Sequence, residues 1–456
     1  MEAQEILKRQ RELFRSNGTR AVPFRISQLH RLKEVLKQNE SFLYDAIELD
    51  FGKSRFETYM TELALIYGEI NLAIRKLPSW SRKRRMPTNL ANFPAESFVI
   101  PEPYGNALVI GAWNYPYQLS LIPAVSAIAA GCTVVVKPSE LAANASRAMA
   151  HLLNDALDTS VLYVAEGGVP ETTELLEERF DKIFFTGGVS IGRIVYQAAA
   201  RHLTPVTLEL GGQNPAIVLK DCNLPMTARR IAWGKSLNAG QSCVAPNHVW
   251  VHRSIEGDFL DGLRTWVRRL CGDAGEIHQR SVRIISDRHF ERLSALIDPE
   301  RVFLGGHADR EARIIHPTVL KDVTPEDPVM EDEIFGPILP VLSFEDIDEP
   351  IAHIKSRSRP LALYIFSQSR PSIDRILTEV PFGGGAVNDT VLHFTNPHLP
   401  FGGVGTSGIG SYHGEAGFRA FSHFKSVLDK PCWFEPFLKY PPHSRLKRKL
   451  LQLLLE

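Results

Sequence analysis

Short apolar runs alternate with helical stretches along the chain from residue 105 onwards. Four of these runs have the length and the β-branched or aromatic content of buried strands, at residues 107–111, 133–136, 161–164 and 183–185. Helical stretches lie between them, at residues 120–130 and up to about residue 157. This alternation predicts βαβ units and a parallel sheet. Because ligands of such sheets bind beyond the carboxyl ends of the strands, we expect Lys137 and Gly187 to lie on one edge.

A second α/β stretch follows residues 209–212, where we place the junction of two domains. Its predicted strands are 216–219, 248–251, 362–366 and 385–387, and its predicted helices are 224–233 and 258–270. The first eighty residues predict helices, because Leu29, Leu32, Leu36 and Leu43 recur at near-helical spacing. The basic run at 82–85 and the Pro-rich stretch after it predict a connector. A localisation or nucleic-acid patch is the alternative.

The chain's last twelve residues, 445–456, read RLKRKLLQLLLE. The basic residues gather at the start of this stretch. Four leucines share one helical face: Leu446, Leu450, Leu453 and Leu454. Such a helix docks on the protein's own surface or touches a membrane surface, and both alternatives stay open. It is too short to span a bilayer.

Composition narrows the function classes. The 456 residues carry 52 basic and 52 acidic side chains, so the net charge is zero and binding of nucleic acid by bulk electrostatics is not expected. The five cysteines show no CxxC spacing, and their odd, sparse number fits a reducing compartment. The charged N-terminus has no apolar signal core, and no run of about 18 apolar residues predicts a membrane span. No metal site is expected, because we find neither HxxxH nor HExxH spacing among the histidines.

Several motifs have a structural and a chemical interpretation. Cys243 follows small and polar residues, as a nucleophile approached by substrate requires, although a lone cysteine is more often a small buried hydrophobe. Glu209 stands in a separate polar cluster, Glu209-Leu-Gly-Gly212, and could serve as a base. Residues 184–192 read as strand, glycine turn and helix start, which suits either a tight turn or a pyrophosphate.

Taken together and in this order, the motifs are specific, and the chain resembles the aldehyde dehydrogenase superfamily along nearly its whole length. The matching stretches are Trp113-Asn-Tyr-Pro116, Lys137-Pro-Ser-Glu140, Phe185-Thr-Gly187 with Gly192, Glu209-Leu-Gly-Gly212, Gly240-Gln-Ser-Cys243, Glu333-Ile-Phe-Gly-Pro337 and Pro400-Phe-Gly-Gly403. The early start, residues 202–212 and Ser411-Tyr-His-Gly414 are most similar to class 3, the branch of dimeric and fatty aldehyde dehydrogenases.

The resemblance implies NAD- or NADP-dependent oxidation of aldehydes to carboxylic acids through a cysteine thiohemiacetal and a thioester. By motif position, Cys243 is the nucleophile, Asn114 the side-chain donor of the oxyanion hole and Glu209 the base that activates water for thioester hydrolysis. The presence of Glu209 favours a free acid over an acyl-CoA product. The alternatives are a CoA-acylating aldehyde dehydrogenase and a non-catalytic structural protein on the same fold, as some lens crystallins are.

The resemblance also implies the cofactor and substrate sites. The expected cofactor-binding residues are Trp113, Lys137, Glu140, Gly187, Gly188, Gly192, Leu210, Glu333 and Phe335. Glu140 near the ribose 2′-hydroxyl favours NAD, and NADP stays open because class 3 members often use both. Gly188 stands where many relatives have serine, and Gln213 replaces a lysine common in class 3.

Positions that match the class 3 aldehyde tunnel are Leu65, Tyr115, Gln118, Leu119, Leu237, Ser242, Val391, Phe394, Thr395 and His413. Most are apolar and none is charged, which favours medium- or long-chain, aromatic or isoprenoid aldehydes, at about 0.8 kcal/mol per buried methylene. Leu65 and Val391 are alternatively simple core residues.

The implied fold is α/β. It has a Rossmann-like cofactor domain (1–81 and 105–208), an α/β catalytic domain (209–392) and a small β bridging or oligomerisation region (82–104 and 393–430). A C-terminal segment (431–456) gates the tunnel or contacts a membrane. We expect a cytoplasmic homodimer, with peripheral membrane contact as an alternative, and a small-molecule aldehyde as its substrate.

Overall fold

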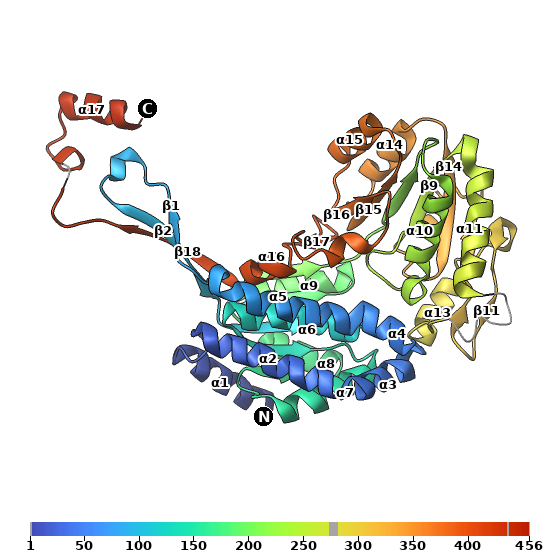
Figure 1. The fold of residues 1–456 in the computed structure, drawn as a ribbon, viewed down its shortest axis with the longest axis horizontal. Coiled ribbons are helices and arrows are strands. Elements are labelled where there is room, and N and C mark those ends of the chain that lie inside the picture. Colours follow the sequence, from blue (N-terminus) through green and yellow to red (C-terminus); the bar gives the residue numbers. More distant parts are fainter. Residues whose placement is uncertain (1, 273–280, 436, 456) are drawn as a thin grey trace.

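The computed structural model describes residues 2–272, 281–435 and 437–455, and Figure 1 shows their arrangement. Two sheets covered by helices lie side by side, and a slender three-stranded arm leaves the first of them. The mixed α/β class predicted from the alternating pattern is confirmed.

The first sheet has six strands in the order β17-β7-β6-β3-β4-β5. Five are parallel, and β17 pairs antiparallel to β7 at the edge. The strand bounds are β3 Asn106–Ile110, β4 Thr133–Lys137, β5 Leu162–Val164, β6 Lys182–Thr186, β7 Val206–Glu209 and β17 Gly408–Ile409. All four apolar runs predicted as strands in this part of the chain are confirmed.

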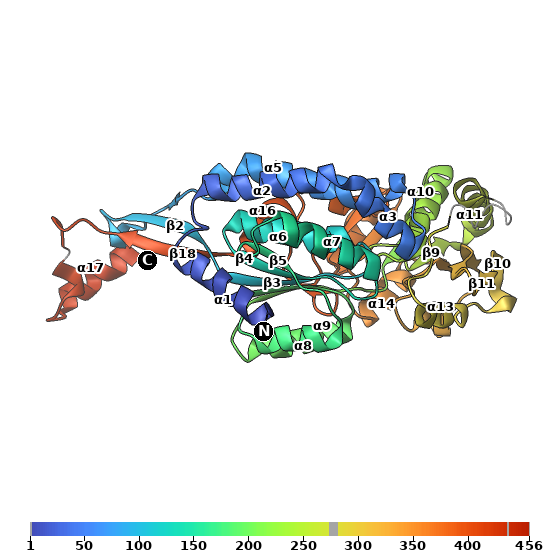
Figure 2. The same ribbon diagram turned by 90° about the horizontal axis from the view of Figure 1, so that it is seen from below.

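Alternation along these strands builds two cores. Val109, Val134 and Val136 face one core, whereas Leu108 and Val135 face the other, because successive side chains of a strand point to opposite faces. Figure 2 shows helices on both sides of the sheet. One side carries α2 Val22–Gln38, α3 Glu40–Phe51, α5 Ala64–Trp80, α6 Pro116–Ala130 and α7 Ala143–Ala156; the other carries α1 Glu2–Arg15, α8 Val169–Glu177 and α9 Val189–Ala200.

The second sheet has seven strands in the order β10-β13-β14-β9-β8-β15-β16, all parallel except β10. Its strands are β8 Pro215–Val218, β9 His248–His252, β10 Val302–Leu304, β13 Thr318–Leu320, β14 Ile338–Phe344, β15 Ala362–Phe366 and β16 Gly384–Val387. Helices around it are α10 Leu224–Ser236, α11 Glu256–Cys271, α13 Asp287–Ser294, α14 Asp348–Ser356 and α15 Arg370–Glu379, and a small hairpin pairs β11 Ala308–Asp309 with β12 Ile314–Ile315.

The arm is an antiparallel sheet of β1 Arg84–Met86, β2 Glu96–Pro103 and β18 Ser422–Asp429. It projects from the body, and α17 Arg445–Leu455 lies at its far end (Figure 1). Between β17 and β18, α16 Gly414–Ala420 packs back on α5 and α6. Residues 393–430 therefore contribute both to the first sheet and to the arm. No helix among the described residues is long and apolar enough to cross a bilayer.

Candidate functional site

The candidate site begins at the carboxyl edge of the first sheet. Here β3, β4, β6 and β7 end side by side, because Ile110 at the end of β3 pairs with Lys137 on β4 and with Phe185 on β6. Residues that follow or end these strands meet at one edge: Asn114, Lys137, Gly187 and Glu209. Lys137 and Gly187 thus share an edge, as the sequence predicted.

The loop that carries Cys243 comes from the second unit, after α10. It starts with the turn Leu237–Gly240, in which three residues in a row are left-handed: Asn238 (φ 51°), Ala239 (φ 52°) and Gly240 (φ 68°). Glycine is required at position 240, because a Cβ there would lie 2.3 Å from the Gly336 carbonyl oxygen. The turn reverses the chain and presents Gln241, Ser242 and Cys243 to the edge of the first sheet.

Burial raises the pKa of the Cys243 thiol, and the nearby charges of Glu333 and Glu209 raise it further. Cys243 is therefore near enough to both carboxylates for their charges to act on it. In this environment the thiol holds its proton at neutral pH, so a base or a bound electrophile is needed before it reacts.

Asn114 lies between β3 and α6 and is 2% exposed. Its Nδ2 donates to the Gln241 carbonyl oxygen at 3.2 Å, so its amide lies against the backbone two residues before Cys243. A side-chain N–H and a nearby backbone N–H are the donor types that stabilise an oxyanion.

Glu209 is the last residue of β7 and is 3% exposed. Its backbone oxygen accepts a hydrogen bond from the Gly187 N–H at 3.0 Å. Neither carboxylate oxygen has a hydrogen-bond partner within the described structure. Burial raises the pKa of this carboxyl well above its usual range, so Glu209 is a stronger base than an ordinary glutamate.

Glu333 approaches the same edge from the second unit. Its side chain packs against Gly211, where an added Cβ would lie 1.9 Å from Glu333 Oε2. Burial raises the pKa of Glu333 to about 7, although the Gly212 N–H, Lys235 and Arg292 oppose this shift. Two residues further, Phe335 packs edge-on against Trp113 with ring centroids 5.3 Å apart.

The glycine turn after β6 leaves open space at a helix start. Gly188 precedes the first residue of α9, and a Cβ there would meet no described atom within 4 Å. A Cβ at Gly192 would instead lie 2.7 Å from Leu210 Cδ2, so glycine lets α9 approach the strand end. The exposed N–H groups of such a helix start suit a pyrophosphate.

Lys137 ends β4 with a buried side chain whose Nζ donates to the Pro138 carbonyl oxygen at 2.7 Å. Burial lowers the pKa of Lys137, and Glu140 and Glu171 partly restore it. Glu140 is exposed three residues later. The two residues have opposite charges and lie at the carboxyl end of β4, which β3 separates from β6 and its glycine turn.

The expected tunnel residues form two groups. Near Cys243, Ser242 hydrogen-bonds to the phenol of Tyr115, and Leu119 and Gln118 follow on the buried first turns of α6. In the second group, the His413 Nδ1 lies 3.0 Å from the Phe394 carbonyl oxygen. Leu237 is half-buried, Val391 is buried with a φ of 63°, Leu65 packs against the main core, and Thr395 is exposed.

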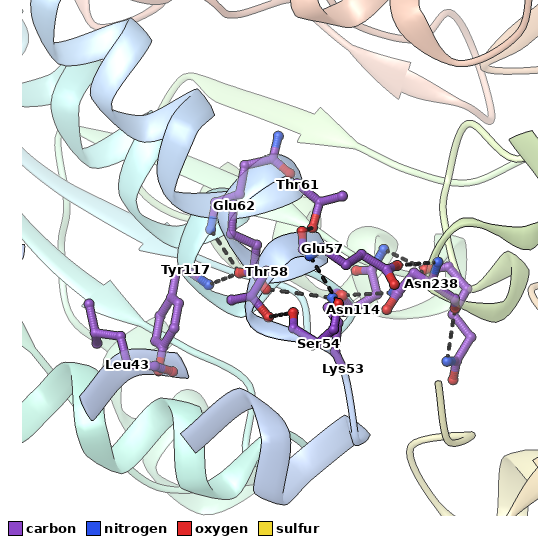
Figure 3. Close-up of polar contacts among 12 residues, drawn as sticks. Leu43, Lys53, Ser54, Glu57, Thr58, Thr61, Glu62, Asn114, Tyr117 and Asn238 are labelled. Carbon is purple, nitrogen blue, oxygen red and sulfur yellow. Dashed lines mark hydrogen bonds and ion pairs between the residues drawn. The ribbon is translucent and has the colours of Figure 1, made fainter. Parts of the chain in front are cut away.

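The structure also brings in residues that sequence reasoning missed. Glu57 and Glu62, from the segment before α5, contact Asn238 and the start of α6 respectively (Figure 3). No local motif marks them, because Glu57 and Asn238 are 181 positions apart in the chain.

Nothing in the described ranges groups three His, Cys, Asp or Glu side chains as a metal site would. His248 and His252 do have HxxxH spacing, so the sequence analysis was wrong to find none. They lie on strand β9, where four residues span about 13 Å, and not on one turn of a helix.

A doubly wound sheet whose carboxyl edge faces a cysteine loop from a second α/β unit defines a dinucleotide-dependent oxidoreductase with a thiol in its site. The aldehyde dehydrogenase family model matches residues 1–427, and the chain belongs to this family. It is therefore an NAD(P)-dependent aldehyde dehydrogenase, which oxidises aldehydes to carboxylic acids.

Individual relatives that match this chain carry the name of the same family. The chain is 43% identical to the dimeric NADP-preferring aldehyde dehydrogenase of Rattus norvegicus over 440 residues, which cover 96% of this chain and 97% of the relative. It is 42% identical to the 4,4'-diaponeurosporen-aldehyde dehydrogenase of Staphylococcus aureus over 433 residues, 94% of each. The solved substrate-bound state of Staphylococcus aureus AldH superposes with a TM-score of 0.97 at 40% identity, covering 100% of this chain and 99% of that one.

Proposed function

We propose that Cys243, Asn114 and Glu209 perform the oxidation. The observation that carries this proposal is their meeting at one edge: a partly buried thiol, a buried amide donor and a buried carboxylate without a hydrogen-bond partner among the described residues. In the first step the Cys243 thiol gives its proton to solvent water and its sulfur forms a bond to the aldehyde carbon. The carbonyl oxygen becomes an oxyanion, which the Asn114 amide and the Cys243 backbone N–H stabilise, one such donor contributing about 3–4 kcal/mol.

When bound, the nicotinamide ring of NAD(P) supplies the acceptor for the hydride of the aldehyde carbon. After the oxidation Cys243 carries a thioester. Glu209 takes a proton from water, whose oxygen attacks the thioester carbon. The carbon–sulfur bond breaks, the acid leaves and the Cys243 sulfur recovers a proton.

The chain's residues fit this cofactor. We propose that the glycine turn at 187–192 receives the pyrophosphate, since an open position at Gly188 starts a helix. Lys137 and Glu140 would hold the adenosine ribose, while Glu333 would hold the nicotinamide ribose. Trp113, Leu210 and Phe335 would supply apolar contacts around them. The exposed Glu140 repels a 2′-phosphate and supports NAD as the preferred form.

We propose medium- or long-chain, aromatic or isoprenoid aldehydes as substrates. The tunnel positions around Tyr115 and around Phe394 carry no charged side chain, and a Staphylococcus aureus relative is named for a carotenoid aldehyde. An apolar tunnel gains affinity with each methylene it buries.

We further propose the domain division 1–81 with 105–208, 209–392, and 82–104 with 393–430, and a homodimer formed through the arm. Two observations support the dimer: the projecting three-stranded sheet and the name of a dimeric relative. The C-terminal segment 431–456 would gate the tunnel or touch a membrane surface. Basic residues and exposed Trp433, Phe437 and Leu446 support a contact of this kind, and Glu456 lies outside the described residues.

The test is reduced-cofactor formation by the purified protein with decanal and with acetaldehyde, each with NAD and with NADP. We expect a higher kcat/KM for decanal, NAD at least matching NADP, and no turnover in Cys243→Ala. Activity on acetaldehyde alone would refute the tunnel. Turnover that depends on added coenzyme A would refute hydrolysis by Glu209, and a Cys243→Ala variant with normal turnover would refute the nucleophile.

A further inference from the structure

Residues 53–62 reach from the N-terminal helices to the corner where Asn114 meets the Cys243 loop (Figure 3). The proposed mechanism uses none of them. Ser54 caps the short helix α4 Arg55–Thr58 by accepting from the Glu57 N–H at 3.1 Å. A single π-turn, η1 Tyr59–Leu63, then leads into α5. Such π-turns are often found at functional sites, and here Glu57 precedes the turn and Glu62 lies within it.

Glu57 holds the left-handed turn before Cys243. Its Oε1 accepts a hydrogen bond from the Asn238 backbone N–H at 2.9 Å. Asn238 is fully buried, and both it and Ala239 have a positive φ, a conformation that costs about 1 kcal/mol or more per residue and persists only where neighbours enforce it. A carboxylate acceptor makes a stronger bond than a neutral one, so Glu57 is suited to enforce it.

The Asn238 side chain transmits this constraint to the oxyanion donor. Its Nδ2 donates to the Asn114 carbonyl oxygen at 2.9 Å and to the Gln241 carbonyl oxygen at 3.0 Å. The Gln241 oxygen also accepts from Asn114 Nδ2. Asn238 therefore ties the backbone of Asn114 to the backbone two residues before Cys243. These bonds fix the separation of the two groups that would stabilise the oxyanion.

Glu62 holds the other side of the same corner. Its Oε2 accepts from the Tyr117 N–H at 2.8 Å, in the first turn of α6 and three residues beyond Asn114. Its Oε1 lies 3.6 Å from Lys53 Nζ, and both side chains are fully buried. The segment 53–62 thus contacts both parts of the oxyanion site. Glu62 contacts the start of the helix that follows Asn114, and Glu57 contacts the loop that carries Cys243.

We infer that Glu57 is a positioning residue for aldehyde oxidation: through Asn238 it holds the Asn114 amide and the Cys243 loop in register. This inference rests on the roles proposed for Asn114 and Cys243. It predicts that loss of Glu57 lowers kcat by way of Asn114, while Cys243 stays accessible and the cofactor site is unaffected.

The test is a double-mutant cycle with decanal and saturating NAD, using Glu57→Ala, Asn114→Ala and the two combined. We expect kcat to fall about 10²–10³-fold in Asn114→Ala and about 10–100-fold in Glu57→Ala. The combined variant should lie within about threefold of Asn114→Ala, since residues acting as a unit are not additive. NAD affinity and the rate of Cys243 alkylation by iodoacetamide should change less than threefold.

Two variants separate positioning from folding. Glu57→Gln keeps an acceptor oxygen for the Asn238 N–H and should recover most of the lost kcat. Arg55→Ala, on the exposed side of the same helix and paired with the exposed Asp45, should match the unchanged protein. The inference is overturned if Glu57→Ala behaves like Arg55→Ala, or if its effect multiplies fully with that of Asn114→Ala. A normal kcat in Asn114→Ala would instead refute the proposed oxyanion donor.

Discussion

Replacement of Glu209 by glutamine tests the proposed base with little disturbance of the fold. The side chain is 3% exposed, and neither of its oxygens has a partner among the described residues, so the isosteric amide loses no hydrogen bond. Burial raises the pKa of Glu209, which means that the charged form is the unfavourable one in the folded protein. Neutral glutamine should therefore leave the free energy of unfolding unchanged or slightly higher.

The kinetic effect should be large. A positioned general base contributes about 10²–10⁴-fold, or about 3–5 kcal/mol of activation free energy. If Glu209 acts only on the thioester, Glu209→Gln should still acylate Cys243. Rapid mixing with decanal and NAD should then give a burst of about one reduced cofactor per subunit, followed by turnover slowed about 10²–10⁴-fold.

The control is Glu174→Gln, an exposed carboxylate on α8, which should keep normal turnover. The reasoning fails if Glu209→Gln turns over within about threefold of the unchanged protein. It also fails if burst and turnover disappear together, because Glu209 would then act before the oxidation, on the thiol of Cys243.

Three further predictions concern Glu62, His248 and Phe394. Glu62→Gln leaves the buried Lys53 ammonium without its counter-charge, so the free energy of unfolding measured in urea should fall by about 3–5 kcal/mol. The double variant Lys53→Met, Glu62→Gln should recover most of this loss. An equal loss in the single and the double variant would contradict the prediction. His248 has its pKa lowered to about 3, first by burial, so it stabilises the fold above pH 6.5 and loses this contribution as pH falls towards 3. The loss from pH 6.5 to 5 is about 2 kcal/mol, which His248→Leu should remove from the pH dependence measured by urea unfolding; an unchanged slope would refute it. Phe394→Ala should lower kcat/KM for decanal about tenfold and for acetaldehyde less than twofold, and an equal effect on both would argue against a tunnel wall at this position.

The sequence predicts the central strands because each is an apolar run between helices. Buried parallel strands such as β3 and β4 need apolar side chains on both faces, and this makes them visible in a single sequence. No such apolar run predicts the strands of the arm. β2 pairs with β18 over eight residues, although His423 and its partner Glu102 are 321 positions apart and β2 contains two prolines. Only a resemblance to the family suggested that a β region lies there.

The candidate site likewise has residues that the sequence predicts and residues that it does not. Cys243, Glu209 and the glycine turn stand in short motifs whose residue types follow from their chemistry. The residues that position them do not stand in such motifs, because their role depends on contacts between segments distant in the sequence. Glu57 has no sequence feature that distinguishes it from the other acidic residues of the helical region, and the left-handed turn at Asn238 carries an alanine that no propensity places there.

Three glutamates of this corner have different surroundings, and the difference follows from what each must do. Glu62 accepts two backbone N–H groups of α6 and lies beside Lys53, although burial still raises its pKa. Only an ionised carboxylate makes full use of these donors and this ammonium, so Glu62 is suited to hold a helix and to keep its charge.

Glu209 has neither donors nor a cation within the described structure, and its pKa is raised by burial alone. A carboxylate left this way stabilises nothing, and its raised pKa favours uptake of a proton, as a base must achieve in each turnover. Glu57 lies between these extremes: half-buried, with one oxygen on the Asn238 N–H, it fixes geometry without needing to exchange a proton. The same residue type therefore supplies a support, a base and a positioning contact, and the hydrogen-bond donors around each carboxylate decide which.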